Sequence, residues 1–181
     1  MLRKLRRVIA ALSVVLSAFA VTEGVAEASA PATVLAGDYA IHSAYDFRCL
    51  DVYANGAGPW VQVWTCNSQA NQTFFWLHYQ DTETYEFRTS DYWCVDGRYG
   101  RGSSLERSPC TGALSQRWRL DTSSHGYGFV IKSALYPDLV WDVYDNGRGT
   151  KVQLWDNNGQ VNQAWTFSCV SCLAAAGSSA R

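Results

Sequence analysis

Apolar and polar residues alternate in three short segments that recur along the chain. Residues 39–43 read Tyr-Ala-Ile-His-Ser, residues 85–89 read Tyr-Glu-Phe-Arg-Thr and residues 129–133 read Phe-Val-Ile-Lys-Ser. Apolar side chains at every second position indicate β-strands with one buried face and one wet face. From residue 31 onward, no stretch has the period of a long amphipathic helix. The pattern therefore predicts an all-β fold.

Each alternating segment opens one copy of a longer repeated unit. In every copy an Asp follows a short apolar lead, a Gly-rich turn region comes next, and the copy ends on Gln, any residue and an aromatic. The three aspartates, Asp51, Asp96 and Asp142, are 45 and 46 residues apart. A fixed period of this length is typical of a structural repeat that shares a core with its neighbours. We expect about four short strands in each copy, about twelve in all, within one domain.

The first and third copies share a set of polar and aromatic residues that the second copy lacks. The first copy carries Asp51, Gln62, Trp64, Asn71 and Gln72. At the matching positions the third copy carries Asp142, Gln153, Trp155, Asn162 and Gln163. The second copy keeps Asp96 and Gln116, but has Glu106, Ser108 and Ser115 where the others have Gln, Trp and Asn. Function is therefore expected in what the first and third copies share.

The Asp lead and the threefold Gln-x-aromatic motif resemble those of the ricin-type β-trefoil lectin domain, over about residues 37–168. The resemblance implies a pseudo-threefold β-trefoil with one shallow sugar pocket in each repeat. It also implies that the leading Asp and the Asn before the final Gln bind sugar hydroxyls, while the aromatic residue that ends the Gln-x-Trp strand stacks on the sugar ring. Those roles fall to Asp51, Asn71 and Trp64 in the first copy and to Asp142, Asn162 and Trp155 in the third.

These residue types also suit a sugar on physical grounds. A sugar has a rim of hydroxyls and an apolar face of C–H groups, so its site needs one flat aromatic and a few fixed donors and acceptors. An ionised Asp accepts hydroxyl protons in charge-assisted hydrogen bonds, and Asn offers both a donor and an acceptor. In the second copy, Ser108 has no ring face and Ser115 is too short to replace an amide. We therefore expect two working sites, in the first and third copies.

Two kinds of residue persist even in the second copy. We expect the Gln before each final aromatic to orient the Asp of its copy, and the final aromatic to pack in the core. The Gln residues are Gln72, Gln116 and Gln163, and the aromatics are Phe74, Trp118 and Trp165.

Three further assignments concern residues beside the motif. Gln62 and Gln153 either contact the sugar or brace their strands, and Tyr53 and Tyr144 are candidates for a second contact. His42 matches Arg88 and Lys132 of the other copies, so a solvent-facing position is expected.

The first thirty residues have the composition of a secretory signal peptide. Four basic residues precede an apolar run over residues 8–20, which is too short to span a bilayer, and small residues follow. Cleavage after Ala30 would place Pro31 at the new terminus, so cleavage after Ala28 or Ala20 remains open. We expect residues 1–30 to be this signal peptide, residues 31–172 the lectin domain and residues 173–181 a disordered tail.

Six cysteines in an exported chain indicate disulfides. Cys49 and Cys66 of the first copy match Cys94 and Cys110 of the second, so one bridge is expected within each of these copies. Cys169 and Cys172 lie past the last repeat, where a zinc site would need two more ligands. We expect a local bridge between them, with a free or intermolecular thiol pair as the alternative.

Charge and composition exclude other kinds of function. Without residues 1–30, eleven basic residues remain against fourteen acidic ones, a formal charge of about −3, so nucleic acid is not an expected partner. No His, Cys or Ser constellation suggests a nucleophile with its base, and no carboxylate cluster has cation spacing. Catalytic residues, metals and cofactors are therefore not expected.

The sequence predicts a secreted, non-catalytic lectin for galactose-like sugars or a plant polysaccharide such as xylan. A glycoside hydrolase would place two carboxylates across one cleft, whereas these aspartates are distributed one to a repeat. A trefoil that binds or inhibits another protein would not need the Asp and Asn in two copies. The only glycosylation sequon starts at Asn71, inside the first site, which favours a bacterial extracellular protein. The sugar and the oligomeric state are left open.

Overall fold

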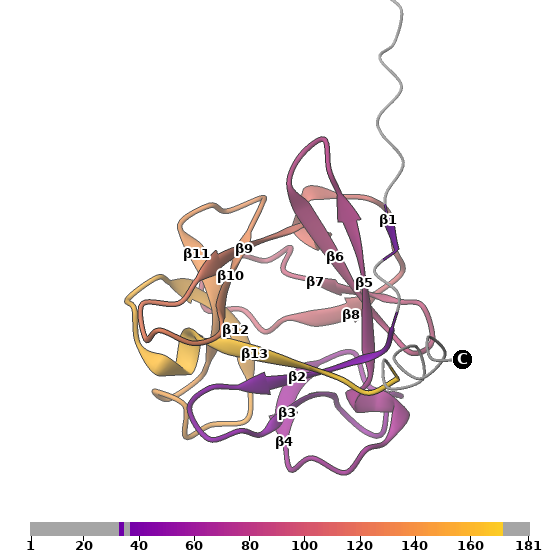
Figure 1. The fold of residues 1–181 in the computed structure, drawn as a ribbon, viewed down its shortest axis with the longest axis horizontal. Helices are drawn as coiled ribbons and strands as arrows, with labels where there is room; N and C mark the ends of the chain where they lie inside the picture. The colour runs from indigo at the N-terminus through magenta and orange to yellow at the C-terminus, as the bar shows by residue number, and fades with distance from the viewer. Residues whose placement is uncertain (1–32, 35–36, 172–181) are drawn as a thin grey trace, which may run out of the picture.

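The computed structural model describes residues 33–34 and 37–171, and most of its elements are strands (Figure 1). Strands β2 to β13 fall into three sets of four, one for each copy of the repeat, which confirms the all-β prediction and the twelve strands. A two-residue strand, β1 (Thr33–Val34), precedes them. Within the described residues, no helix has the length and apolar character needed to cross a membrane. The expected signal peptide and C-terminal tail lie outside these residues.

The three sets have the same order of strands, and equivalent strands differ in length by at most two residues. The first is β2 (Tyr39–Ser43), β3 (Cys49–Val52), β4 (Val61–Trp64) and β5 (Phe74–Tyr79). The second is β6 (Thr84–Thr89), β7 (Cys94–Asp96), β8 (Glu106–Ser108) and β9 (Trp118–Thr122). The third is β10 (Phe129–Ser133), β11 (Leu139–Val143), β12 (Val152–Asp156) and β13 (Trp165–Cys169). One turn of 3-10 helix precedes the last strand of each set: η1 (Ala70–Gln72), η2 (Leu114–Gln116) and η3 (Val161–Gln163).

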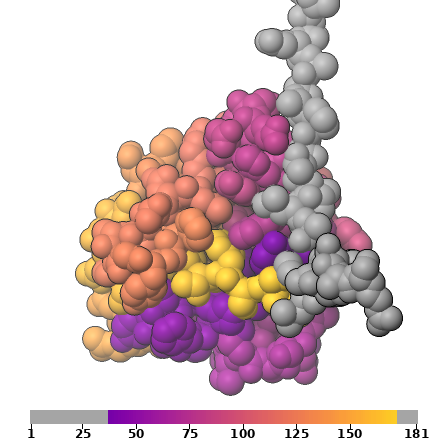
Figure 2. Space-filling model, in the orientation of Figure 1, coloured from indigo at the N-terminus to yellow at the C-terminus, as the bar shows by residue number. Residues whose placement is uncertain are grey.

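The first and last strands of the three sets close into a barrel. Antiparallel pairing runs from β2 to β5, β6, β9, β10 and β13, and β13 returns to β2. Figure 2 shows the end of this circuit, with the last strand in yellow between the indigo and orange segments. The middle strands of each set form a hairpin attached to the first strand, as β3 and β4 are to β2. Closure leaves the six barrel strands without a free edge.

The last aromatic of each copy lies inside the barrel, as the repeat predicts. Phe74, Trp118 and Trp165 are at most 1% exposed. Trp141 of the third copy lies between the two tryptophans, with ring centroids 5.1 Å from Trp118 and 5.8 Å from Trp165, both edge to face. This contact is a favourable arrangement of aromatic rings, so the copies share one core.

Two of the expected disulfides are present. Cys49 bonds to Cys66 and Cys94 bonds to Cys110, and each bridge ties the lead strand to the segment after its hairpin. Cys169 is also disulfide-bonded. Its expected partner, Cys172, lies outside the described residues, so that pairing stays a prediction.

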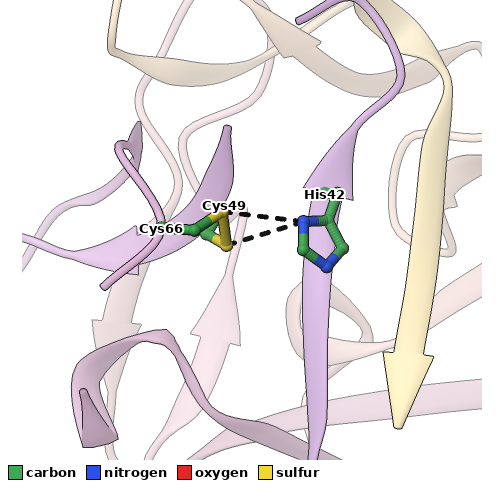
Figure 3. A group of neighbouring side chains, drawn as sticks. All are labelled: His42, Cys49 and Cys66. Atoms are coloured by element: carbon green, nitrogen blue, oxygen red, sulfur yellow. Dashed lines mark hydrogen bonds between the residues drawn. A yellow bond between two sulfur atoms is a disulfide. The ribbon is translucent and has the colours of Figure 1, made fainter. Parts of the chain in front are cut away.

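The side chain of His42 packs against the first disulfide and is half-buried (Figure 3). Its Nδ1 lies 3.5 Å from the sulfur of Cys49 and 3.7 Å from that of Cys66, and its Nε2 is 2.8 Å from the Ser168 hydroxyl. The expected solvent-facing position is therefore confirmed in part: His42 lies on the outer face of β2, but β13 and the bridge cover some of its side chain. The three side chains are close enough for a metal site, but sulfurs joined in a disulfide offer no thiolate ligand.

Candidate functional site

The hairpins of the three copies have the same strand register, which fixes the equivalence of their residues. Opposite Asp51, Asp96 and Asp142 lie Gln62, Glu106 and Gln153. Two positions before the aspartates, Cys49, Cys94 and Val140 lie opposite Trp64, Ser108 and Trp155. The register therefore confirms the repeat alignment, including Ser108 in the place of a tryptophan.

In the first copy, three side-chain amides surround the carboxylate of Asp51. Gln62 donates to Oδ1 at 3.0 Å, while Asn71 and Gln72 donate to Oδ2 at 2.8 and 2.9 Å. Turn η1 delivers the last two residues, and the carboxylate is buried. Gln72 also donates to the carbonyl of Thr65, and its Oε1 accepts the amide proton of Asn67. These bonds fix the side chain of Gln72 and let it orient Asp51.

The third copy builds the same network with the same geometry. Gln153 donates to Oδ1 of Asp142 at 3.0 Å, and Asn162 and Gln163 both donate to Oδ2 at 2.9 Å. Asn162 uses its other N–H on the carbonyl of Val143, and its Oδ1 is buried without a protein partner. An unpaired buried acceptor is costly, so this oxygen marks an unsatisfied position of the third network.

The hydrogen bonds that remain free define what each network can bind. A carboxylate has about four lone-pair positions, and three amide donors fill three of them. Asn71 gives both its N–H groups to protein oxygens, Asp51 and Val52, so its Oδ1 remains as an acceptor. Gln62 has given one N–H to Asp51. Asp51 and Asn71 therefore offer one acceptor position each and Gln62 offers one donor, a set that matches neighbouring hydroxyls.

A shallow hollow of about 230 Å³ lies over the first network. Asp51, Gln62 and Trp64 line it together with Tyr53 and the 54–55 turn. The Trp64 side chain is 48% exposed, so a ring face is available beside the polar groups. The structure thus brings together the predicted residues of the first copy, with Asn71 and Gln72 below them.

The third site differs from the first because a residue of the second copy covers its tryptophan. The guanidinium of Arg101 lies 4.2 Å from the ring centroid of Trp155, which is half-buried. Arg101 also binds both carboxylate oxygens of Asp156. Hydrogen bonds from Arg101 lower the pKa of the Asp156 carboxyl, so the pair is charged at neutral pH. Only part of the Trp155 surface is therefore open to a ligand.

In the second copy, Arg98 bonds to the carboxylate of Asp96. The equivalent carboxylates of the other two copies are left partly free. The guanidinium of Arg98 forms an ion pair with Oδ2 of Asp96 at 3.0 Å, and its backbone N–H donates to Oδ1 at 2.9 Å. Ser108 and Gln116 donate to the same Oδ2. Sequence reasoning missed Arg98, although a signal was present: two residues after the Asp, the other copies have Tyr53 and Tyr144.

Comparisons with known proteins agree with this fold. No curated protein matches the chain. Among solved structures, a mosquitocidal holotoxin matches 73% of this chain with a TM-score of 0.66 and 14% identity, and a Clostridium thermocellum exo-β-1,3-galactanase matches 75% with a TM-score of 0.65 and 20% identity. The matches cover only 17% and 30% of those two longer chains. A Macrolepiota procera ricin B-like lectin, solved with lactose, matches 73% of this chain and 94% of its own, with a TM-score of 0.60 and 18% identity.

These likenesses show the fold, a β-trefoil. The family is shown by the sequence itself, because residues 37–165 match the family model described as the ricin-type beta-trefoil lectin domain. That match covers most of the 181 residues. The chain therefore belongs to the ricin-type β-trefoil lectin family.

Proposed function

We propose that the chain is a lectin with two carbohydrate-binding sites, in the first and third copies of the repeat. The observation that carries the proposal is a buried Asp held by three amides beside a partly open tryptophan, built twice with the same hydrogen bonds. The second copy has Ser108 in place of the tryptophan and an arginine on its carboxylate. The first and third copies therefore have both a tryptophan for stacking and a partly free carboxylate for hydroxyls, and the second copy has neither.

Galactose-like sugars or a plant polysaccharide such as xylan are the proposed ligands. Their pyranose rings have an apolar face for Trp64 or Trp155 and adjacent hydroxyls for the Asp and Asn of each site. The Macrolepiota procera lectin was solved in complex with lactose, and the Clostridium thermocellum enzyme is a galactanase, which supports the galactose-like class.

A catalytic role is not proposed for this domain. Hydrolysis of a glycosidic bond uses two carboxyl groups about 5 to 9.5 Å apart across one cleft. The hollow of the first site is lined by one carboxylate, that of Asp51. Binding without bond cleavage is the activity that such a site supports.

We also propose that the protein is exported and acts outside a bacterial cell. The disulfides Cys49–Cys66 and Cys94–Cys110 form and persist in oxidising compartments. Residues 1–30 have the composition of a signal peptide. Asn71 is buried in the first network, so a glycan on its amide would break the bond to Asp51.

A glycan array followed by calorimetry tests the proposed function. The wild-type protein should bind glycans that end in galactose or contain xylan chains, while the Trp64→Ala, Trp155→Ala double variant should bind none of them. Ser108→Ala is the matched control, and it should bind as the wild type does. An array without any bound glycan, or a double variant with full binding, would refute the proposal.

A further inference from the structure

A second exposed tryptophan lies on the same strand face as the platform of the first site. Trp60 directly precedes β4, and its backbone continues the strand through a bridge to Glu106. Side chains alternate along a strand, so Trp60, Gln62 and Trp64 point to one face, while Val61 and Val63 are buried in the core. The two tryptophans are 50% and 48% exposed. Trp60, Gln62 and Trp64 thus form a row of side chains on the outer face of the strand.

The hollow at Trp60 adjoins the hollow of the first site. Its volume is about 280 Å³, and Trp60, Ser104 and Lys151 line it together with Tyr53 and Gln62. Tyr53 and Gln62 also line the hollow at Trp64. Because both hollows share these two residues, they lie next to each other on the surface.

The aromatic side chain in the second hollow is peculiar to the first copy. Trp60 bridges to Glu106, Ser104 to Gln153 and Lys151 to Gln62, so each copy contacts the next in the same way. Trp60, Ser104 and Lys151 are therefore equivalent positions around the pseudo-threefold axis. A tryptophan, a serine and a lysine stand there, and the third copy has no second platform.

The ring of Trp60 is held in place by Tyr53. Their centroids are 5.6 Å apart, with the planes tilted by 53°. Tyr53 itself crosses Gly58, where an added Cβ would lie 2.7 Å from the Tyr53 ring. Glycine at this position therefore allows the aromatic pair to form beside the first site.

We propose that Trp60 is a second stacking platform, and that the first site binds a linear oligosaccharide across both hollows. This inference rests on the proposed function. Four residues of extended strand separate the backbones of Trp60 and Trp64 by about 13 Å, a distance that needs at least two linked sugar rings. Gln62, between the tryptophans, keeps one N–H for a hydroxyl, and Ser104 adds a hydroxyl at the far end.

Affinity as a function of chain length tests this inference. The parent protein carries Trp155→Ala, which removes binding at the third site, so that the titration measures the first site. It is titrated by calorimetry with two series of β-1,4-linked probes: xylose to xylotetraose, and galactose to galactotetraose. For the series that binds, affinity of the parent should rise from the monosaccharide to the tetrasaccharide. Adding Trp60→Ala should lower the tetrasaccharide affinity by about three- to tenfold, the effect of one stacking contact, and flatten the rise.

The control is Tyr127→Ala in the same parent, because Tyr127 is also 50% exposed and lies in the turn between β9 and β10. It should keep the full dependence on length. The inference is overturned if the parent binds all lengths with equal affinity, or if Trp60→Ala leaves the tetrasaccharide affinity undiminished. In either case, binding of the monosaccharide leaves the proposed function standing. If neither the parent nor the wild type binds any member of either series, both the inference and the proposed function are overturned.

Discussion

The side chain two positions after the leading Asp is one of the differences between the second copy and the other two. Where the first and third copies have Tyr53 and Tyr144, the second has Arg98, which neutralises Asp96. The sequence predicted the loss of the second site from Ser108 and Ser115, but not this ion pair. Whether an arginine at this position reaches the Asp of its own copy depends on the conformation of the turn after that Asp. The spacing of the residues alone does not specify this conformation. The same limit applies to Arg101, whose contact with Trp155 joins two copies.

Replacing the central carboxylate by an amide tests the hydrogen-bond networks. In Asp51→Asn, one carboxylate oxygen becomes a donor that faces the donors of Gln62 or Asn71. We expect the first site to lose at least about tenfold in sugar affinity, and the free energy of unfolding to fall by about 1–3 kcal/mol. Calorimetry and urea denaturation measure the two effects.

Asp96→Asn is the matched variant, because its carboxylate is buried in the same place in the second copy. It should lose stability but keep all the sugar binding. Unchanged binding in Asp51→Asn would exclude the carboxylate as a ligand group.

The ion pair of Arg101 and Asp156, beside the third site, predicts a contribution to the stability of the fold that depends on pH. Hydrogen bonds from Arg101 lower the pKa of Asp156 in the folded protein. The stabilisation is therefore fully present above the unfolded-state pKa, about 3.9, and is lost as pH falls through the lower folded-state value. Both side chains are exposed, so the effect on stability is small. A carbon-13 NMR titration should give a lower pKa for Asp156 in the wild type than in Arg101→Ala; equal values would contradict the pairing.

At the scale of elements, the sequence predicted most of the fold. The alternating segments 39–43 and 129–133 coincide with β2 and β10, and the third lies within β6, which starts one residue earlier. These predictions succeeded because each strand has one face in the barrel core. The contact of His42 with the first disulfide was not predicted, since a position beside a disulfide has no signature in a two-residue period.

The two bridges within the repeats should each stabilise the fold. Cys49–Cys66 and Cys94–Cys110 close loops of similar length, 17 and 16 residues in sequence separation. On the chain-entropy account, loss of either bridge should cost about 3 kcal/mol. The double substitutions Cys49→Ser with Cys66→Ser, and Cys94→Ser with Cys110→Ser, are compared with the wild type by chemical denaturation. Peptide mapping without reduction would show at the same time whether Cys169 pairs with Cys172.

At the scale of the molecule, the closed barrel holds the two proposed sugar sites in a fixed relation, and the two differ. The hairpins that carry the sites are attached to β2 and β10, and both of these strands pair with β13. Trp64 is open, whereas Arg101 covers part of Trp155. We therefore expect the first site to bind more tightly than the third, a difference that single-site variants would reveal.

A rigid two-site arrangement should bind polymers far better than single sugars. One shallow pocket buries little surface and must offset the loss of ligand freedom, so monosaccharide binding should be weak. After one site has bound a polysaccharide, the second contact becomes effectively intramolecular, and avidity can raise the overall affinity by about 10² or more. Trp64→Ala and Trp155→Ala should each remove one calorimetric site and sharply weaken retention on an insoluble polysaccharide, with the larger loss from Trp64→Ala, whereas Ser108→Ala should change neither. A wild-type stoichiometry of one site would contradict two pockets on this frame, and equal retention of the single variants and the wild type would show that the two sites do not engage one polymer together.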